Sequence, residues 1–375
     1  MSIHRPIHAQ IQYTHTRRLS FFFFNQETLD NDETGALALG LEAVHFLAAR
    51  RGGMLITLLY SRSISHDETW RVAATRARET MLESLSVNSK DENHETKHDP
   101  AALNLLGRSK NVAVSIGPVN YVVEELTLSD GKVLTYHQPE GAFSNPNAFV
   151  AEHTVDWLVD VSRTTVVAAM RGLRTDDENE NENAATPHQP SLLELFCGNG
   201  NHTVALAGSF HAVAAVEISK SLCQAARLNL TRNGIENARV FEAPSEYVAR
   251  AMLKKRRSGK ATAGTGDNPE TNPDDIKSLD VTKDSIKSLD VSQYDVVLVD
   301  PPRAGLDTDT LALVKQFPVI LYISCDPNSL FQNATCPKYG LAATHKLERF
   351  AVFDHFPYTK HVECGAVWVR KDLAV

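Results

Sequence analysis

A cysteine and a glutamate stand beside apolar runs near the carboxyl end of the sequence. Cys325 directly follows the apolar run Val319–Ser324, and Glu363 lies in the polar, turn-rich stretch Phe353–Gly365 between two further apolar runs. A thiolate is a strong nucleophile, and Glu363 or the nearby His361 can exchange protons with a substrate. These residues are therefore candidates for a nucleophile and an acid–base group. The alternatives are an inert, buried thiol and a carboxylate that is simply solvated.

A glycine-rich turn follows another apolar run. Leu192–Phe196 leads into Gly198 and Gly200, whereas a dinucleotide-binding fingerprint would require a third glycine where Thr203 stands. Glu217 ends the next apolar run, at a spacing typical of an acid that accepts hydrogen bonds from ribose hydroxyls. A nucleoside ligand without a pyrophosphate, such as S-adenosylmethionine, fits this pattern. The alternative is a structural turn with a surface glutamate.

Asp300 closes a third apolar run and is followed by Pro301, Pro302 and Arg303. A carboxylate at the carboxyl end of a parallel strand faces the same crevice as the glycine-rich turn, and the two prolines stiffen its backbone. Enzymes that methylate exocyclic amines tend to carry an aromatic residue where Arg303 stands. The sequence therefore points away from exocyclic amine methylation.

The elements that must position these residues alternate between strands and helices. From residue 147 onward, largely apolar runs of strand length are separated by stretches with helical periodicity. This alternation predicts a parallel sheet with helices on both faces. We therefore predict an α/β domain over residues 142–375, in which the candidate residues follow the carboxyl ends of the strands.

The part of the chain before residue 142 has a different texture. Met54–Tyr60 is expected to form a strand and Asp67–Ser84 an amphipathic helix. Three short strands are expected to form a meander: Asn111–Ile116, Tyr121–Leu126 and Lys132–His137. We predict a reduced α+β region over residues 53–141, preceded by a divergent or partly disordered terminus over residues 1–52.

Two polar stretches interrupt the α/β domain, at about 175–190 and 256–293. Both combine low hydrophobicity with high charge, and the second contains the hexapeptide IKSLDV twice, at Ile276 and Ile286. Such segments bury too little apolar surface to offset the entropy of ordering, so they are predicted to be disordered inserts.

The composition excludes several classes of protein. The 375 residues include 38 Lys and Arg against 46 Asp and Glu, and the net charge of −8 excludes a uniformly basic nucleic-acid-binding protein but not a local basic cleft. No apolar run approaches the roughly 20 residues that span a bilayer, so no membrane association is expected. The five cysteines form no CxxC pair, so we expect no disulfide scaffold, metal site or iron–sulfur cluster.

The amino-terminal 26 residues contain no Asp or Glu but include Arg5, Arg17 and Arg18. An acid-free, Arg-bearing start is typical of an organelle transit peptide. A mitochondrial or plastid location is therefore the alternative to the cytoplasmic location that we expect.

Four long motifs occur in the order LLELFCGNGN, VDPPRAGLD, LYISCDPNSL and FDHFPYTKHVECG. Together they resemble the RNA uracil-5-methyltransferase family, most closely its tRNA-directed branch. The likeness is strong over residues 143–371 apart from the inserts, and it weakens back to residue 53. The resemblance implies a Rossmann-like, S-adenosylmethionine-dependent methyltransferase domain preceded by a smaller, shortened α+β RNA-binding domain.

The resemblance also implies roles for individual residues. The nucleophile of the family falls on Cys325, and its general base falls on Glu363. The residues that would contact the methyl donor are Asn145, Phe196, Asn201, Glu217 and Asp300.

Three positions depart from the family pattern. Asn145 and His355 each replace a Gln, and Asp326 replaces an Asn next to the nucleophile. The shorter Asn145 would contact its ligand over a longer distance or through water. The carboxylate of Asp326 is expected to raise the pKa of the Cys325 thiol and so to disfavour the thiolate.

The chemistry of uracil explains why a cysteine and a glutamate would act together. Carbon 5 is a poor nucleophile, but addition of a thiolate to carbon 6 turns the ring into an enolate that can attack a methyl donor. A base must then remove the proton from carbon 5 so that the thiol can leave. The uridine must also flip out of its stack to reach such a crevice. Arg303, Lys360 and Arg370 are candidates for phosphate contacts.

Two features bear on the RNA substrate. The Arg-rich strand that relatives carry in their amino-terminal part has no equivalent here. Members with a four-cysteine iron–sulfur site upstream act mostly on ribosomal RNA, and no cysteine precedes Cys197 in this sequence. The absent cluster favours the tRNA-directed branch, so we expect methylation of the T-loop uridine of tRNA. We also expect the protein to be a monomer. The alternatives are a ribosomal RNA uracil-5-methyltransferase and a non-catalytic RNA-binding or tRNA chaperone protein.

Overall fold

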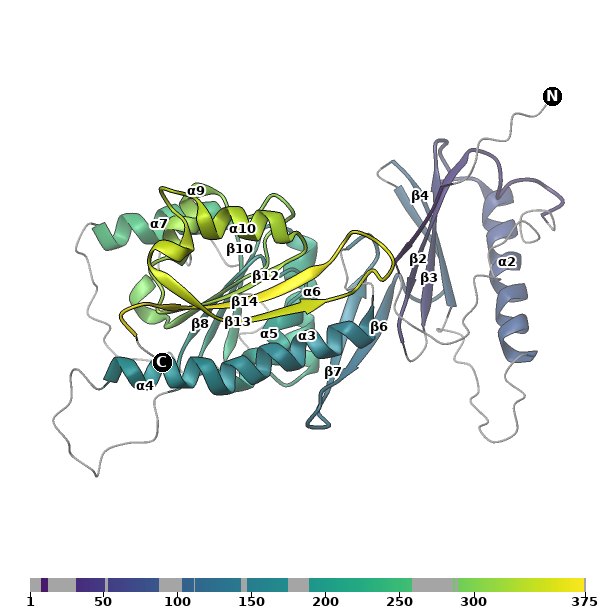
Figure 1. Ribbon diagram of the computed structural model, residues 1–375. Helices are drawn as coiled ribbons and strands as arrows, with labels where there is room; N and C mark the ends of the chain where they lie inside the picture. Colours follow the sequence, from purple (N-terminus) through teal and green to yellow (C-terminus); the bar gives the residue numbers. More distant parts are fainter. Residues whose placement is uncertain are drawn as a thin grey trace. The chain divides into compact units, whose positions relative to one another are not determined.

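The computed structural model describes residues 8–12, 32–50, 53–87, 103–110, 112–142, 147–174, 189–257, 286 and 289–373 (Figure 1). The chain divides into two compact units. One consists of residues 1–127 and 135–151, and the other of residues 128–134 and 152–375. The sequence pattern had suggested a single boundary near residue 141.

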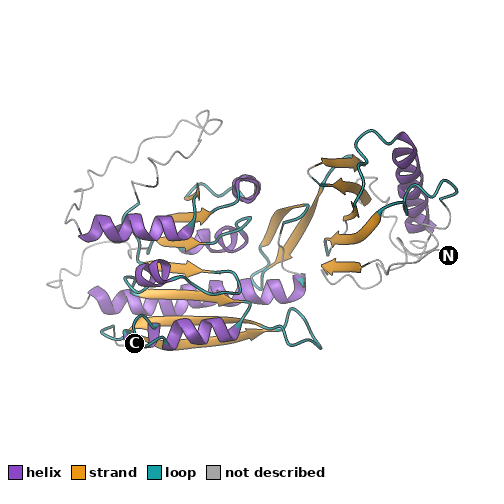
Figure 2. Cartoon of the chain, turned by 90° about the horizontal axis from the view of Figure 1, so that it is seen from above, coloured by secondary structure: helices purple, strands orange, loops and turns teal. Residues whose placement is uncertain are grey.

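The second unit is built on a seven-stranded sheet with the order β10-β9-β8-β11-β12-β14-β13 (Figures 1 and 2). Its strands are β8 (Leu192–Leu195), β9 (Val213–Glu217), β10 (Ala238–Glu242), β11 (Val296–Val299), β12 (Val319–Ser324), β13 (His345–Phe353) and β14 (Glu363–Arg370). Strands β8 to β12 pair in parallel, and β14 is antiparallel to both β12 and β13. The mostly parallel sheet predicted from the sequence is confirmed.

Helices cover both faces of this sheet (Figure 1). On one face, Met252 of α7, Leu311 of α9 and Leu330 of α10 belong to a single apolar core with the sheet. On the other face, Trp157 of α3 lies so close to β14 that a Cβ at Gly365 would come within 2.5 Å of its ring. The helices of this unit are α3 (Ala148–Val161), which continues through the π-helical turn η2 (Ser162–Val166) into α4 (Val167–Arg174), α5 (Asn201–Leu206), α6 (Lys220–Arg232), α7 (Ser245–Arg257), α9 (Thr308–Val314), α10 (Pro327–Thr335) and the short 3₁₀ turns η3 (Ala207–Ser209), η5 (Val291–Gln293) and η6 (Leu341–Ala343).

The first unit contains a five-stranded sheet in the order β1-β2-β3-β4-β5. Its elements are β1 (His8–Gln12), β2 (Leu41–Ala48), β3 (Met54–Tyr60), β4 (Leu103–Ser109), β5 (Val112–Ile116) and the helix α2 (Glu68–Val87). Trp70 and Met81 of α2 share an apolar core with Ile56 and Leu105 of the sheet. Strand β2 lies within residues 1–52, so this part of the segment expected to be divergent belongs to the folded unit.

The predicted three-stranded meander is wrong. β5 pairs with β4, whereas β6 (Tyr121–Thr127) and β7 (Val133–Pro139) form a separate two-stranded sheet. The backbone turns between β5 and β6 at Gly117, whose φ of 121° is unfavourable for other residues. The side chain of Asn104 stabilises this turn by accepting a hydrogen bond from the backbone N–H of Val119 (3.3 Å).

The insert expected over residues 256–293 is folded at its carboxyl end. Ile286, Leu289 and Val291, from the second IKSLDV copy, are buried in the same core as α7. The carboxylate of Asp290 lies 3.1 Å from Nζ of Lys255. This end of the insert therefore belongs to the core, contrary to the expected disorder. Residues 258–285 and 175–188 lie outside the described ranges.

Candidate active site

Five of the residues predicted to form the site meet at one edge of the seven-stranded sheet. Glu217 ends β9, while Phe196, Asp300 and Cys325 directly follow β8, β11 and β12. The carboxyl ends of parallel strands share one edge, and because β14 runs in the opposite direction, its first residue, Glu363, comes to that edge as well. The strand order places Asp300 in the middle of this group.

Cys325 and Glu363 adjoin the last pair of residues in the ladder between two neighbouring strands. The antiparallel ladder of β12 and β14 ends with Ser324 opposite Cys364; Cys325 follows Ser324, and Glu363 precedes Cys364. Successive side chains of a strand point to opposite faces, and Cys364 belongs to the core on the side of α7, α9 and α10, so Glu363 projects from the other face. Cys325 lies close enough for the charge of Glu363 to raise the pKa of its thiol. The pairing predicted from the sequence is thus brought together by strand register.

The carboxyl group of Glu363 is almost completely buried. Burial is the main cause that raises the pKa of Glu363, and the negative charge of Asp300 adds to it. Burial likewise raises the pKa of Asp300, although 34% of its side chain is accessible. A carboxylate whose pKa is raised in this way is a better proton acceptor than a solvated one.

The thiol of Cys325 is half buried, and burial raises its pKa. The charges of Asp300 and Glu363 raise the pKa of this thiol further, whereas Arg303 lowers it. The sequence had assigned the upward shift to Asp326. That cause is wrong, because Asp326 turns its carboxylate toward α10, where Oδ1 accepts a hydrogen bond from the backbone N–H of Asn328 (2.9 Å) and caps the helix.

The glycine-rich turn is tied to the end of β9. The carboxylate of Glu217 accepts hydrogen bonds from the backbone N–H groups of Gly198 (3.1 Å) and Ser219 (2.7 Å). Gly200 precedes α5 with φ 80°, and Phe196 adopts φ 64°, which is uncommon for a residue with a side chain. A strained turn of this kind is typical of a ligand-binding site.

The groups at this edge fit S-adenosylmethionine. Glu217 and Asp300 offer carboxylates to hydroxyl and amine donors, and Phe196 presents a half-buried aromatic ring. Asn201, at the start of α5, completes the turn. The stretch from 196 to 203 contains no Lys or Arg that would favour a phosphate, so the charges suit a cationic nucleoside.

Two buried residues at this edge were missed by the sequence reasoning. Glu194 lies within β8, and burial raises its pKa to about 8. His202 follows Asn201 on α5, its Nδ1 lies 4.0 Å from Oδ2 of Asp300, and burial lowers its pKa to about 4. An acid inside an otherwise apolar strand was the available signal for Glu194.

Strands β13 and β14 form the hairpin expected at the sheet edge. The histidine beside the proposed base is, however, not the predicted acid–base candidate His361. The ring of His361 contacts that of Phe356, with centroids 6.1 Å apart. The histidine beside Glu363 is instead His355, whose Nε2 lies 3.7 Å from Oε1 of Glu363.

The other predicted contacts have different outcomes. Asn145 lies outside the described residues, so its contact with the donor stays a prediction. Arg370 is the last residue of β14, at the other end of the strand from Glu363, and it pairs with Asp372 (2.7 Å); its phosphate contact stays a prediction. Arg303 and Lys360 are exposed, and their phosphate contacts stay predictions.

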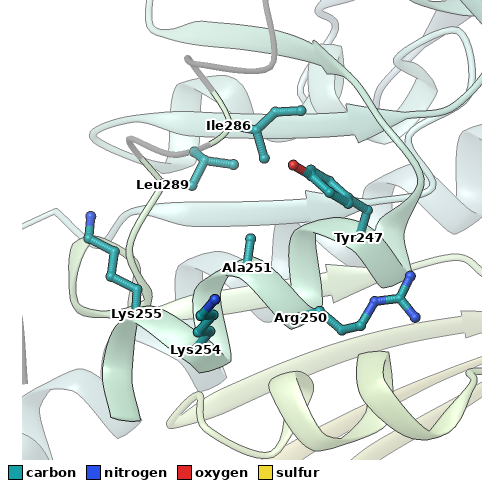
Figure 3. Close-up of a pocket in the computed structure, with 7 residues that line it drawn as sticks. All are labelled: Tyr247, Arg250, Ala251, Lys254, Lys255, Ile286 and Leu289. Atoms are coloured by element: carbon teal, nitrogen blue, oxygen red, sulfur yellow. The ribbon is translucent and has the colours of Figure 1, made fainter. Parts of the chain in front are cut away.

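A pocket of about 520 Å³ lies along α7, away from the strand ends (Figure 3). It is lined by Tyr247, Arg250, Ala251, Lys254, Lys255, Ile286 and Leu289. Arg250 pairs with Asp309 (3.4 Å) and Lys255 pairs with Asp290 (3.1 Å). The lining contains none of the predicted site residues, so this pocket is separate from the reactive pair.

Within the described ranges, no group of three or more His, Cys, Asp or Glu side chains is arranged to hold a metal ion. Among the helices that the structure describes, none is both long and apolar enough to cross a membrane.

Comparison with known proteins links this arrangement to a family. The chain matches the family described as tRNA (Uracil-5-)-methyltransferase over residues 24–169, 181–263 and 279–371. It is 33% identical over 336 residues to the tRNA/tmRNA (uracil-C(5))-methyltransferase of Shewanella frigidimarina (strain NCIMB 400), covering 90% of this chain and 73% of the relative. It is 36% identical over 328 residues to the protein of the same name from Pseudomonas putida (strain W619), covering 88% and 70%.

Among solved structures, tRNA (uracil-54, C5)-methyltransferase of Pyrococcus abyssi in complex with S-adenosyl-L-homocysteine matches with a TM-score of 0.48 and 17% identity, covering 86% of this chain and 58% of that one. A superposition this loose adds nothing to the sequence relationship. The family match and the curated relatives, which extend over most of the chain, show that the protein belongs to the tRNA (uracil-5-)-methyltransferase family.

Proposed function

We propose that the protein transfers a methyl group from S-adenosylmethionine to carbon 5 of a uridine in tRNA. The observation that carries this proposal is that β12 and β14 bring Cys325 and Glu363 to the edge of the sheet where Glu217 and Asp300 also lie, close enough for the charges of Glu363 and Asp300 to act on the thiol. A nucleophile and a base at one edge of the sheet can reach the same pyrimidine, beside the groups that suit the methyl donor.

The reaction proceeds through a covalent bond between the protein and the uracil ring. The thiolate of Cys325 adds to carbon 6, and the electron pair of the 5,6 double bond makes carbon 5 nucleophilic. S-adenosylmethionine, when bound, would supply the methyl group to carbon 5; the bond from the methyl carbon to the donor's sulfur would break with its electrons on sulfur, and S-adenosylhomocysteine would leave. Glu363 then takes the proton from carbon 5, the electron pair of that C–H bond restores the double bond, and the thiolate leaves carbon 6.

The charges around Cys325 determine how much of its thiol is in the reactive thiolate form. The Cys325 thiol must lose its proton before it attacks, and its raised pKa makes the reactive form scarce at neutral pH. Arg303 opposes this effect because its positive charge lowers the pKa of the thiol. Arg303 therefore has a role in activating the nucleophile, separate from any contact with RNA.

The tRNA substrate is supported by the relatives at 33% and 36% identity, which are named tRNA/tmRNA (uracil-C(5))-methyltransferases. The T-loop uridine is a finer proposal that rests on the family resemblance. A non-catalytic RNA chaperone would need neither Cys325 nor Glu363, so the paired residues favour catalysis. The monomeric state and the cytoplasmic location, with mitochondrion or plastid as the alternative, stay predictions from the sequence.

The test is to incubate the full chain with S-adenosylmethionine labelled in its methyl group and with either tRNA or ribosomal RNA transcripts. We expect label in tRNA, at carbon 5 of one uridine in the T-loop, located by mass spectrometry of nuclease fragments. Label that enters the ribosomal transcript alone would replace the tRNA assignment with the ribosomal one.

Variants separate the two chemical roles. Cys325→Ala should abolish methyl transfer but leave binding of the donor intact, whereas Glu363→Gln should form the covalent RNA adduct and fail to release it. Cys336→Ala, which removes a thiol at the end of α10, is the matched control and should retain activity. Normal turnover by either Cys325→Ala or Glu363→Gln would show that the role of that residue is wrongly assigned.

A further inference from the structure

A histidine that the mechanism above does not use lies beside the proposed base. The side chain of His355 is 0% exposed, and its Nε2 lies 3.7 Å from Oε1 of Glu363 and 3.5 Å from Oγ1 of Thr154. An ionised carboxylate can accept hydrogen bonds but cannot donate them. Whenever Glu363 is ionised, the favourable arrangement therefore has the hydrogen on Nε2 of His355.

The imidazole of His355 is neutral at neutral pH. Burial lowers the pKa of His355 to about 4, and a neutral imidazole carries a single N–H. The other ring nitrogen, Nδ1, is buried and has no hydrogen-bond partner in the described part of the chain. Placing the hydrogen on Nε2 leaves Nδ1 as an unpaired acceptor, which avoids burying an unpaired N–H donor.

Among the described residues, the charges that act on Glu363 and His355 come from carboxylates and not from a cation. The titratable groups that face it are Asp300 after β11, His202 on α5, Cys325 after β12, Cys364 on β14 and Asp354 in the hairpin loop, and α3 contributes the hydroxyl of Thr154. Asp300 raises the pKa of Glu363, and His202 is itself neutral because burial lowers its pKa. Glu363 must therefore be kept ionised against both burial and a neighbouring acid.

We propose, on the basis of the function proposed above, that His355 is a positioning residue whose Nε2–H faces the carboxylate of Glu363 and donates to it once the two side chains move a few tenths of an ångström closer than the 3.7 Å in this structure. The hydrogen bond favours the ionised form of Glu363 and fixes its orientation. An Arg or Lys in this place would stabilise the ionised carboxylate strongly and so make Glu363 a weaker base. The neutral imidazole of His355 stabilises the ionised form less, so Glu363 keeps its affinity for a proton. Glutamine can supply a similar neutral N–H, whereas an apolar side chain cannot.

The proposal makes a claim about pH with a definite sign. A hydrogen bond to the charged form lowers the pKa of an acid, so its removal should raise the pKa of Glu363. Only ionised Glu363 can take the proton from carbon 5. Loss of the donor should therefore move the acidic limb of the release step to higher pH by about one unit, which is about tenfold in rate well below both pKa values.

The experiment isolates that step. Wild type, His355→Leu and His355→Gln are loaded with tRNA and S-adenosylmethionine at low pH, where release is slow, and the covalent adduct is then jumped to buffers between pH 6 and pH 9. Decay of the adduct is followed on denaturing gels. Because Cys325 is already bound to carbon 6, its own titration does not enter the measurement. His355→Met fills the same space with a flexible side chain and serves as the second apolar variant if His355→Leu folds poorly.

We expect the apolar variants to release the adduct about tenfold more slowly than wild type below neutral pH and to approach the wild-type rate near pH 9. We expect His355→Gln to follow the wild-type pH profile. A uniform slowing at every pH would mean that His355 merely shapes the site, and would overturn the proposal. An unchanged midpoint in the apolar variants, or the same upward shift in His355→Gln, would overturn it as well. If wild type itself forms no adduct and labels no tRNA, it is the proposed function that fails.

Discussion

The hydroxyl of Thr203 donates a 2.5 Å hydrogen bond to Oε2 of the buried Glu194. Thr203 stands where a dinucleotide-binding turn would have glycine, and this contact gives the departure a structural reason. The side chain pairs with one oxygen of a carboxyl group that would otherwise be buried without a partner.

The burial of Glu194 should make stability depend on pH. Its pKa is raised from 4.5 to about 8 in the folded state, so between these values the folded state binds more protons than the unfolded state. The contribution of Glu194 to the free energy of unfolding is therefore present at low pH and is lost as the pH rises toward 8. Glu194→Gln stays neutral, and its stability relative to wild type should increase across this interval.

Urea unfolding at several pH values would measure this difference. Glu246→Gln is the matched control, because Glu246 is exposed in the first turn of α7, and its difference from wild type should not follow pH in this way. A constant difference between Glu194→Gln and wild type from pH 5 to pH 8 would show that Glu194 is already ionised in the folded protein.

Glu217 should contribute to donor binding in two ways. Its carboxylate holds the turn through Gly198, and it offers acceptors to a ribose. Glu217→Ala should weaken binding of S-adenosylhomocysteine by about tenfold or more, because hydrogen bonds to a charged group each contribute about 1.5–3 kcal/mol. Isothermal titration calorimetry would measure the change.

Strand β10 offers a matched control for that variant. Glu242 is the direct neighbour of Glu217 in the ladder of β9 and β10, but its side chain is exposed. Glu242→Ala should bind the ligand as wild type does. Equal weakening by both substitutions would mean that general negative charge at this edge, and not the position of Glu217, attracts the donor.

Asp326 should affect the stability of α10 more than the acidity of Cys325. Asparagine caps a helix as well as aspartate does, so Asp326→Asn should leave both the fold and the pKa of the thiol close to wild type, whereas Asp326→Ala should lower the free energy of unfolding by about 1 kcal/mol.

Asp300→Asn should instead lower the pKa of the Cys325 thiol, since the charge of Asp300 is, after burial, the largest cause of its rise. The pH dependence of Cys325 alkylation, read by peptide mass spectrometry, would compare the variants. A clearly lower thiol pKa in Asp326→Asn would restore Asp326 as the cause.

The strand ends that carry the reactive pair could be predicted from local sequence patterns, whereas the choice of Cys325 and Glu363 as nucleophile and base came from the family resemblance. The apolar run before Cys325 and the turn-rich stretch before Glu363 marked the end of one strand and the start of another, and the structure places both at one edge. The parallel order of the sheet followed from the same alternation of runs and helices.

The surroundings of the pair could not be predicted in the same way. The role of His355 depends on how β13, β14 and α3 enclose its ring, which no local pattern encodes. The direction of the Asp326 side chain could not be predicted either, because a residue adjacent to Cys325 in sequence need not direct its charge toward the thiol. The helix α10 begins there, and the carboxylate of Asp326 caps it. The meander failed because pairing partners depend on the turn at Gly117.

The duplicated IKSLDV segment has a consequence for how the chain can change length. The copy that starts at Ile286 supplies the side chains that enter the core, and the copy at Ile276 has the same six residues. A deletion or a further duplication of this ten-residue unit leaves an identical hexapeptide joined to the strand that leads to Asp300. Loss or gain of one ten-residue unit would therefore change the length of the connection after α7 and leave unchanged the hexapeptide whose side chains enter the core.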